Sequence, residues 1–157
     1  MSLNLSETTR KKIDKIIAGY PRKEAALLPI LHLAQKEFGQ ITAAEEQLVA
    51  ELLEIKPIEV REVVTFYTMY NRKAVGKYHI QICSNLSCSL LGSGALVDYL
   101  TEKLGIKPGE TTEDMRFSLS TVECLGACEQ APCMMINFDY HGDLDKEKID
   151  KILEDLK

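Results

Sequence analysis

The chain has 157 residues, 45% hydrophobic and 27% charged, which is ordinary for a globular protein that buries a core. Its formal net charge of -5 argues against nucleic acid as a partner, because nucleic-acid binders concentrate Lys and Arg on one face. Residues 1–10 show no export signal, and the apolar runs are far shorter than the roughly 20 residues of a membrane span, so we expect a soluble, cytoplasmic protein.

Residues 1–75 are predicted to form a small helical bundle. Ser6 is placed to cap a first helix that ends before Pro21, Gly39 is placed to end a second, and Thr42 with Glu45 makes the capping-box pattern of a third. A fourth helix is expected over Ile58–Tyr70. The apolar positions expected to face inward are Ile13, Ile16, Ile17, Tyr20, Leu27, Leu28, Leu31, Ala34, Phe38, Leu48, Val49, Leu52, Leu53, Val60, Val63, Val64 and Tyr67.

A cluster of large apolar residues closes this half of the chain. Phe66, Tyr67, Met69 and Tyr70 fit the core of the bundle best, and a docking patch for a partner is the alternative.

Polar residues 71–76 separate the bundle from a second domain, which we place at residues 76–157. Alternating and periodic segments predict strands and helices in turn, so the fold class is α+β. The expected elements are a strand over Lys77–Ile82, a helix over Ala95–Leu104, a strand over Phe117–Val122, a strand over Met134–Asn137 with a turn near His141 and Gly142, and a last helix capped by Asp145.

Five cysteines, all beyond position 80, indicate metal ligation or redox chemistry, because an odd number cannot pair completely and no export signal is present. Cys83 and Cys88 are separated by four residues, and Cys124 and Cys128 by three. Two such loop-borne pairs suit four thiolates around an iron-sulfur cluster. Zinc is the rival metal, although it usually takes cysteines from C-x2-C knuckles, and neither pair has that spacing.

These motifs resemble the thioredoxin-like [2Fe-2S] ferredoxin family, in the order C-x4-C, a long αβ stretch, then Glu123-Cys-Leu-Gly-Ala-Cys128 followed by Ala131-Pro132. More closely, the chain is similar to the 24-kDa, NuoE-type subunits of NADH:quinone oxidoreductase (complex I) over nearly its whole length. The resemblance implies a thioredoxin-like domain with a mixed sheet after the helical bundle. It also implies that the cluster ligands are Cys83, Cys88, Cys124 and Cys128.

The same resemblance implies a function: one [2Fe-2S] cluster exchanges single electrons with the FMN of a partner subunit that also binds NADH, with complex I as the first assignment. The protein would then lie in the cytoplasm, peripheral on the cytoplasmic face of the inner membrane through the complex. Equivalent subunits occur in NAD-linked hydrogenases, including electron-bifurcating ones, and in NAD-dependent formate dehydrogenases. The sequence does not choose among these parent complexes.

The chain itself is expected to hold neither NADH nor a catalytic residue. Gly92-Ser93-Gly94 is too short a match to the G-x-G-x-x-G nucleotide loop, and electron transfer requires no acid or base from the protein. Two alternatives stay open, namely a zinc-stabilised interaction module without redox chemistry and a free-standing shuttle ferredoxin.

Cys133 has no counterpart among the implied ligands. We interpret it as a packed free thiol, with a redox-sensitive residue or a substitute ligand as the alternatives.

Overall fold

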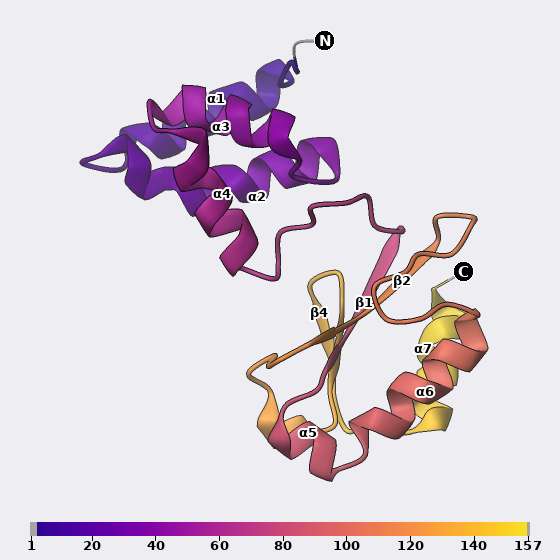
Figure 1. The fold of residues 1–157 in the computed structure, drawn as a ribbon. Coiled ribbons are helices and arrows are strands. Elements are labelled where there is room, and N and C mark those ends of the chain that lie inside the picture. The colour runs from indigo at the N-terminus through magenta and orange to yellow at the C-terminus, as the bar shows by residue number, and fades with distance from the viewer. Residues whose placement is uncertain (1–2, 157) are drawn as a thin grey trace. The chain divides into compact units, whose positions relative to one another are not determined.

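The fold is that of a computed structural model in which residues 3–156 are described (Figure 1). The chain forms two compact units, Met1–Ala74 and Val75–Lys157, and each is described by itself. Among the described residues, no helix is both long enough and apolar enough to cross a membrane.

In the described part of the first unit, residues 3–74, all regular secondary structure is helical. Its elements are α1 (Glu7–Ala18), the 3-10 helix η1 (Lys23–Ala26), α2 (Leu27–Phe38), α3 (Ala43–Leu53) and α4 (Pro57–Phe66). Ser6 caps α1 by accepting the amide of Thr9, and Thr42 and Glu45 form the expected reciprocal capping box on α3. Gly39 ends α2 in the left-handed conformation, with a φ of 79°. The helix starts predicted from these caps are confirmed.

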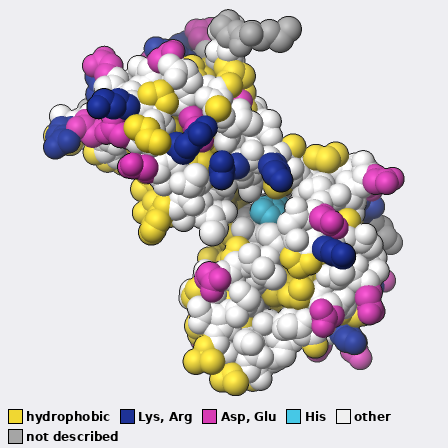
Figure 2. Space-filling view, in the orientation of Figure 1, with side chains coloured by type: hydrophobic (Ala, Val, Ile, Leu, Met, Phe, Trp, Pro, Cys, Tyr) yellow, Lys and Arg dark blue, Asp and Glu magenta, His cyan; other side chains and the backbone are white. Residues whose placement is uncertain are grey.

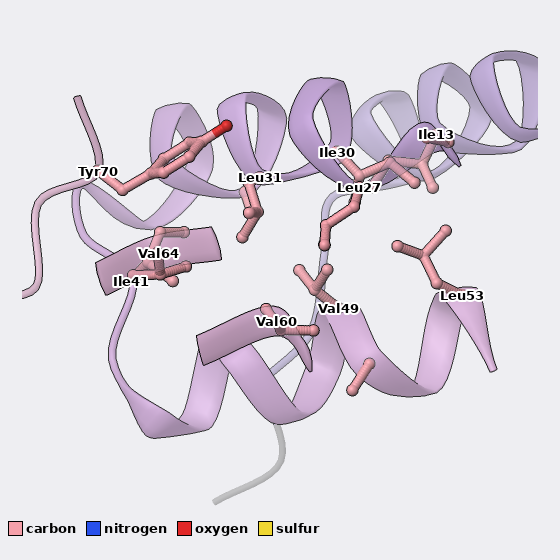
Figure 3. Close-up of a cluster of buried hydrophobic side chains, with 13 residues drawn as sticks. Ile13, Leu27, Ile30, Leu31, Ile41, Val49, Leu53, Val60, Val64 and Tyr70 are labelled. Atoms are coloured by element: carbon pink, nitrogen blue, oxygen red, sulfur yellow. The ribbon is translucent and has the colours of Figure 1, made fainter. Parts of the chain in front are cut away.

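The core of the first unit is made by side chains from all four α-helices (Figure 3). Ile13 of α1, Ile30 of α2, Val49 of α3 and Val60 of α4 are each completely buried. Burying an aliphatic side chain of this size contributes about 1.5–3 kcal/mol to folding. The helices are therefore held together mainly by this shared core, because isolated helices of 10 to 12 residues are marginal in water.

The segment after α4 differs from the sequence expectation. The helix ends at Phe66 instead of continuing to Tyr70, and Tyr67 adopts an extended backbone. Of the four large apolar residues expected in the core, Tyr70 is buried, whereas Phe66, Tyr67 and Met69 are 77%, 36% and 40% exposed. Tyr20, predicted on the inner face of α1, lies beyond the end of that helix and is also exposed.

Contacts with α2 explain why α4 ends early. The Tyr70 hydroxyl donates to the carbonyl of Leu28, and the side-chain amide of Gln35 donates to the carbonyl of Met69. The Gln35 side-chain oxygen also accepts from the backbone amide of Asn71 at 2.6 Å. These tertiary hydrogen bonds hold residues 69–71 against α2. The chain turns after α4, where the Tyr70 amide donates to the Tyr67 carbonyl at 3.2 Å, and a continued helix could not follow this path.

The second unit is a mixed four-stranded sheet with helices, so the predicted α+β class and mixed sheet are confirmed. Its elements are β1 (Tyr78–Cys83), α5 (Leu86–Leu90), α6 (Ser93–Leu104), β2 (Phe117–Val122), the 3-10 helix η2 (Cys128–Gln130), β3 (Met134–Ile136), β4 (Asp139–His141) and α7 (Lys146–Asp155). The strand order is β2-β1-β3-β4; β1 and β2 are parallel, and the other neighbouring pairs are antiparallel.

Helices α6 and α7 lie on the same side of this sheet (Figure 1). Their Leu100 and Ile149 side chains, both completely buried, share a core with Ile80 and Ile82 of β1 and with Met134 of β3. Every second residue of β1 therefore faces the helices, as the period of a strand requires. Because the core holds the sheet rigidly, the loops at the ends of its strands can position functional groups without contributing to that core.

One strand was not predicted from the sequence. The expected turn near His141 is wrong, because His141 lies in β4 and the chain reverses earlier, over Asn137 and Phe138. Asn137 has a positive φ of 56°, which suits a two-residue hairpin turn. Its side chain also accepts from the His79 amide and donates to the Lys77 carbonyl, which ties the hairpin to β1.

Acidification is expected to destabilise the fold through His79. A nitrogen of this half-buried ring lies 2.8 Å from the Ser120 hydroxyl oxygen, and burial lowers the pKa of His79. The unfolded chain binds the proton near the ordinary pKa of about 6.5 while the folded chain resists it, so stability falls as pH decreases below that value toward the lower folded pKa. Urea unfolding at about pH 7.5 and about pH 5.5 should show a smaller loss in His79→Gln than in the wild type. Equal losses in both would contradict this origin.

Candidate metal centre

The loops that carry the two cysteine pairs lie at the same edge of the sheet. Because β1 and β2 are parallel, their carboxyl ends meet there, and each strand leads into one pair. The Ser84 amide donates to the carbonyl of Val122 at 2.9 Å, and the Cys83 sulfur lies 3.7 Å from the carbonyl oxygen of Glu123. Cys83 is the last residue of β1, directly after the strand that was predicted over Lys77–Ile82.

The first loop contains a short helix that was not predicted from the sequence. Asn85 caps α5 by accepting the Leu86 amide at 2.7 Å, and Cys88 lies inside this helix with its side chain 1% exposed. The opposite side of α5 is apolar but open to solvent, where Leu86 and Leu90 are 70% and 77% exposed. Hydrophobic side chains project from the end of the second unit at which α5 lies (Figure 2).

Three sulfur atoms lie close together on the buried side of α5. Those of Cys83, Cys88 and Cys133 all lie within 4.8 Å of one another, and the side chains are at most 2% exposed. The Cys88 and Cys133 sulfurs are 3.7 Å apart. The prediction that Cys133 is packed is confirmed, but its place beside Cys88 had no signal in the sequence, because it follows from the pairing of β3 with β1.

Cys124 and Cys128 lie outside this group of three. Both side chains are exposed, on the loop that follows β2. Two of the residues between them, Leu125 and Ala127, instead face inward and pack against the buried thiols of the group. The structure therefore brings the second loop against the first pair of cysteines, with the sulfurs of the second pair on the outside of that contact.

Backbone conformation and hydrogen bonds hold the second loop in place. Gly126 has a φ of 72°, a conformation that favours glycine, and its amide donates to the Cys124 sulfur at 3.3 Å. The Tyr140 hydroxyl of β4 donates to the carbonyl of Leu125 at 3.1 Å. The β3–β4 hairpin thus supports the loop that carries the second cysteine pair.

The buried thiols differ in how readily they ionise. Burial raises the pKa of Cys83, but hydrogen bonds from the Asn85 and Leu125 backbone amides, with the neighbouring thiols, outweigh it and leave this pKa below its ordinary value. Burial raises the pKa of Cys88, and it raises the pKa of Cys133 to about 12. Cys83 is therefore the thiol of the three that is best prepared to act as a thiolate ligand.

Substitution of Gly142 is expected to disturb the second loop. A Cβ at this position would lie 2.3 Å from the Gln130 Cβ and 2.8 Å from the Gln130 carbonyl oxygen, and Gln130 ends the turn that begins at Cys128. Gly142→Ala should cost about 1–3 kcal/mol, the usual penalty for overpacking, and should weaken metal retention. Gly94→Ala is the matched control, because nothing lies within 4 Å of its Cβ position and α6 should be unchanged or slightly stabilised. Equal thermal unfolding midpoints for the two variants would contradict the clash.

The site as a whole is a sulfur-rich donor set. Five thiols lie on three neighbouring segments, backbone amides donate to the sulfurs of Cys83, Cys88 and Cys124, and the first pair is shielded from water. Such surroundings suit an anionic iron-sulfur cluster, whose sulfurs require hydrogen-bond donors and whose irons require thiolates.

Comparisons with known proteins agree with this chemistry. A sequence model of the family described as thioredoxin-like [2Fe-2S] ferredoxin matches residues 13–157. An NADH-quinone oxidoreductase E subunit of Rhizobium meliloti (strain 1021), the one numbered 2, is 45% identical over 150 residues, which cover 96% of this chain and 89% of the relative. The NADH-quinone oxidoreductase E subunit of Rickettsia typhi (strain ATCC VR-144 / Wilmington) is 46% identical over 158 residues, which cover 98% of this chain and 88% of the relative.

A solved structure with a similar fold is that of a NAD+-reducing [NiFe]-hydrogenase in the air-oxidized state. The TM-score is 0.71 at 26% sequence identity, and the match covers 83% of this chain. It covers 22% of the hydrogenase chain, so this protein corresponds to a minor part of that chain.

Proposed function

Because this chain belongs to the thioredoxin-like [2Fe-2S] ferredoxin family, we propose that it is the electron-transfer subunit of an NADH:quinone oxidoreductase. The second unit has the thioredoxin-like fold, and the cofactor is one [2Fe-2S] cluster. The observation that carries the assignment is the near full-length similarity, at 45% to 46% identity, to E subunits of NADH-quinone oxidoreductases.

We propose Cys83, Cys88, Cys124 and Cys128 as the cluster ligands. Two arguments support this set over one that contains Cys133. The four match the family pattern of C-x4-C and C-x3-C, and the two pairs lie at the carboxyl ends of the parallel strands β1 and β2. The Leu125 amide, which belongs to the second loop, already donates to the Cys83 sulfur of the first.

Other residues of the site affect the negative charge on the ligand sulfurs and the access of water to them. When bound, such a cluster accepts and donates one electron at a time. The Asn85 and Leu125 amides stabilise negative charge on the Cys83 sulfur, and the packing of Leu125 and Ala127 limits access of water to the first pair. No acid or base is required of this chain.

The electron-exchange partner is proposed to be the FMN of a separate subunit that also binds NADH. This chain lacks the G-x-G-x-x-G loop of a dinucleotide site, so the oxidation of NADH is assigned to the partner. Through that partner the protein would be held peripherally on the cytoplasmic face of the inner membrane.

The equivalent subunit of an NAD-linked hydrogenase is the second candidate. It is favoured by the fold similarity to the NAD+-reducing [NiFe]-hydrogenase, although that similarity has the lower sequence identity, 26% against 45%. Both candidates share the cluster and the flavin partner and differ in the enzyme that receives or supplies the electrons.

Metal analysis of the anaerobically purified chain tests the cofactor and the ligand chemistry first. About two iron and two sulfide per chain are expected, with no EPR signal when oxidised and one spin-half signal after dithionite. Stoichiometric zinc without sulfide would refute the electron-transfer function and support a structural zinc module.

Reconstitution with the flavoprotein partner tests whether the partner oxidises NADH and this chain receives the electrons. NADH should reduce the cluster only when the FMN-containing partner is added, and a stable complex of the two should elute together in size-exclusion chromatography. Reduction by NADH without the flavoprotein would refute this assignment. Co-purification of quinone-reducing membrane subunits, as opposed to a nickel-iron subunit, would decide between the two parent enzymes.

We also propose that residues 1–75 and 76–157 are separate domains. Each has its own buried core, and residues 71–76 between them form no helix or strand.

A further inference from the structure

The thiol of Cys133 contacts the sulfur of a proposed cluster ligand. The Cys133 and Cys88 sulfurs are 3.7 Å apart, within the range of a sulfur-to-sulfur hydrogen bond, and both side chains are 1% exposed. Water therefore has little access to either sulfur, so each depends on protein groups for its hydrogen bonds.

Backbone hydrogen bonds to β1 and to the segment before α7 position Cys133. The Cys83 amide donates to the Cys133 carbonyl at 3.2 Å, and the Leu144 amide donates to the carbonyl of the preceding Pro132 at 3.1 Å. The next residue, Met134, pairs with Ile82 of β1. Backbone hydrogen bonds on both sides of Cys133 thus hold its side chain next to Cys88.

Ligation decides the direction of the hydrogen bond. A cysteine bound to iron is a thiolate and has no proton to donate, so only Cys133 can be the donor. We propose that the Cys133 thiol donates a hydrogen bond to the Cys88 ligand sulfur and raises the reduction potential of the cluster. This inference rests on the proposed ligand set, in which Cys133 is the one cysteine of five that remains a thiol.

The effect on the potential follows from charge. Reduction adds one electron to a cluster that is already anionic, so a donor on a ligand sulfur stabilises the reduced form more than the oxidised form. The thiol is a weak donor, but in a buried site its electrostatic effect is screened less than in water.

Two substitutions at Cys133 separate the effect of its hydrogen bond from the effect of its packing. Cys133→Ala removes the side-chain donor but keeps the Cys133 backbone amide, which also bonds the Cys88 sulfur, whereas Cys133→Ser keeps a hydroxyl donor in a side chain of similar size. In the purified full chain, an EPR-monitored redox titration should give a lower midpoint potential for Cys133→Ala than for the wild type, and Cys133→Ser should restore the potential at least in part. Both variants should retain iron and sulfide.

The other outcomes are distinct. Full iron content in Cys133→Ala with an unchanged potential would overturn this inference and leave the proposed function intact. Loss of iron from both folded variants would make Cys133 a ligand, and would overturn both this inference and the proposed ligand set.

A measurement on the wild type requires no variant. The loaded chain should show one infrared S–H stretching band that shifts in D2O, because Cys133 is its one remaining thiol. Absence of the band would overturn the inference.

Discussion

Cys128→Ser is expected to reduce the iron and sulfide content of the purified chain by about tenfold or more, although the Cys128 side chain is exposed and its sulfur lies outside the buried group of three. Loss of even a supporting residue around a metal ligand typically costs 10- to 100-fold in affinity, and loss of a ligand should cost at least as much. The measurement is iron and acid-labile sulfide per chain after anaerobic purification.

Cys133→Ser is the matched control for this substitution. It exchanges the same atoms at a cysteine that we do not propose as a ligand, and it should leave the iron content unchanged. The reverse result, with iron lost from Cys133→Ser and kept by Cys128→Ser, would show that the three buried sulfurs hold the metal and that the proposed set is wrong. The pair of variants therefore chooses between the family pattern and the convergence of sulfurs in the structure.

Ile13→Ala and Ile80→Ala are each expected to cost about 2–5 kcal/mol of unfolding free energy, because both side chains are completely buried. Ile13 belongs to the core of the helical unit and Ile80 to the core of the sheet unit. If the units are separate domains, each substitution should shift a different unfolding transition. Urea titrations followed by far-UV circular dichroism and by the visible absorbance of the cluster distinguish the two.

Ile58→Ala supplies the control for these substitutions. Its side chain is 56% exposed, so the same change of atoms should alter stability by no more than about 0.5 kcal/mol. Ile80→Ala should release the cluster at a lower urea concentration, whereas Ile13→Ala should leave the cluster transition where it is. A single transition that both substitutions shift equally would contradict the division into two domains.

Local signals in the sequence were sufficient for most helices and for the longer strands. Ser6, Thr42 and Asp145 cap the helices for which they were predicted, each by accepting a backbone amide within the next three residues. Gly39 and Gly105 end their helices in the left-handed conformation. Such caps depend on neighbours in the chain, so the sequence alone is enough to find them.

The departures from the sequence expectation have tertiary causes. Hydrogen bonds made by Tyr70 and Gln35 end α4 at Phe66, whose side chain is exposed. No pattern in the sequence near Phe66 predicts that the helix ends there. The β4 strand is only three residues long, too short for a clear alternation, and its place depends on pairing with β3.

For the metal centre, the chemistry could be inferred without the structure, from five cysteines in two spaced pairs and one extra, within the residues 13–157 that the family model matches. Which sulfurs lie close together could not be inferred in this way, because the distance between Cys88 and Cys133 depends on the pairing of two strands far apart in the chain. Ligand spacing is a local property of a loop, whereas the proximity of a fifth thiol is set by sheet register, which no short motif encodes.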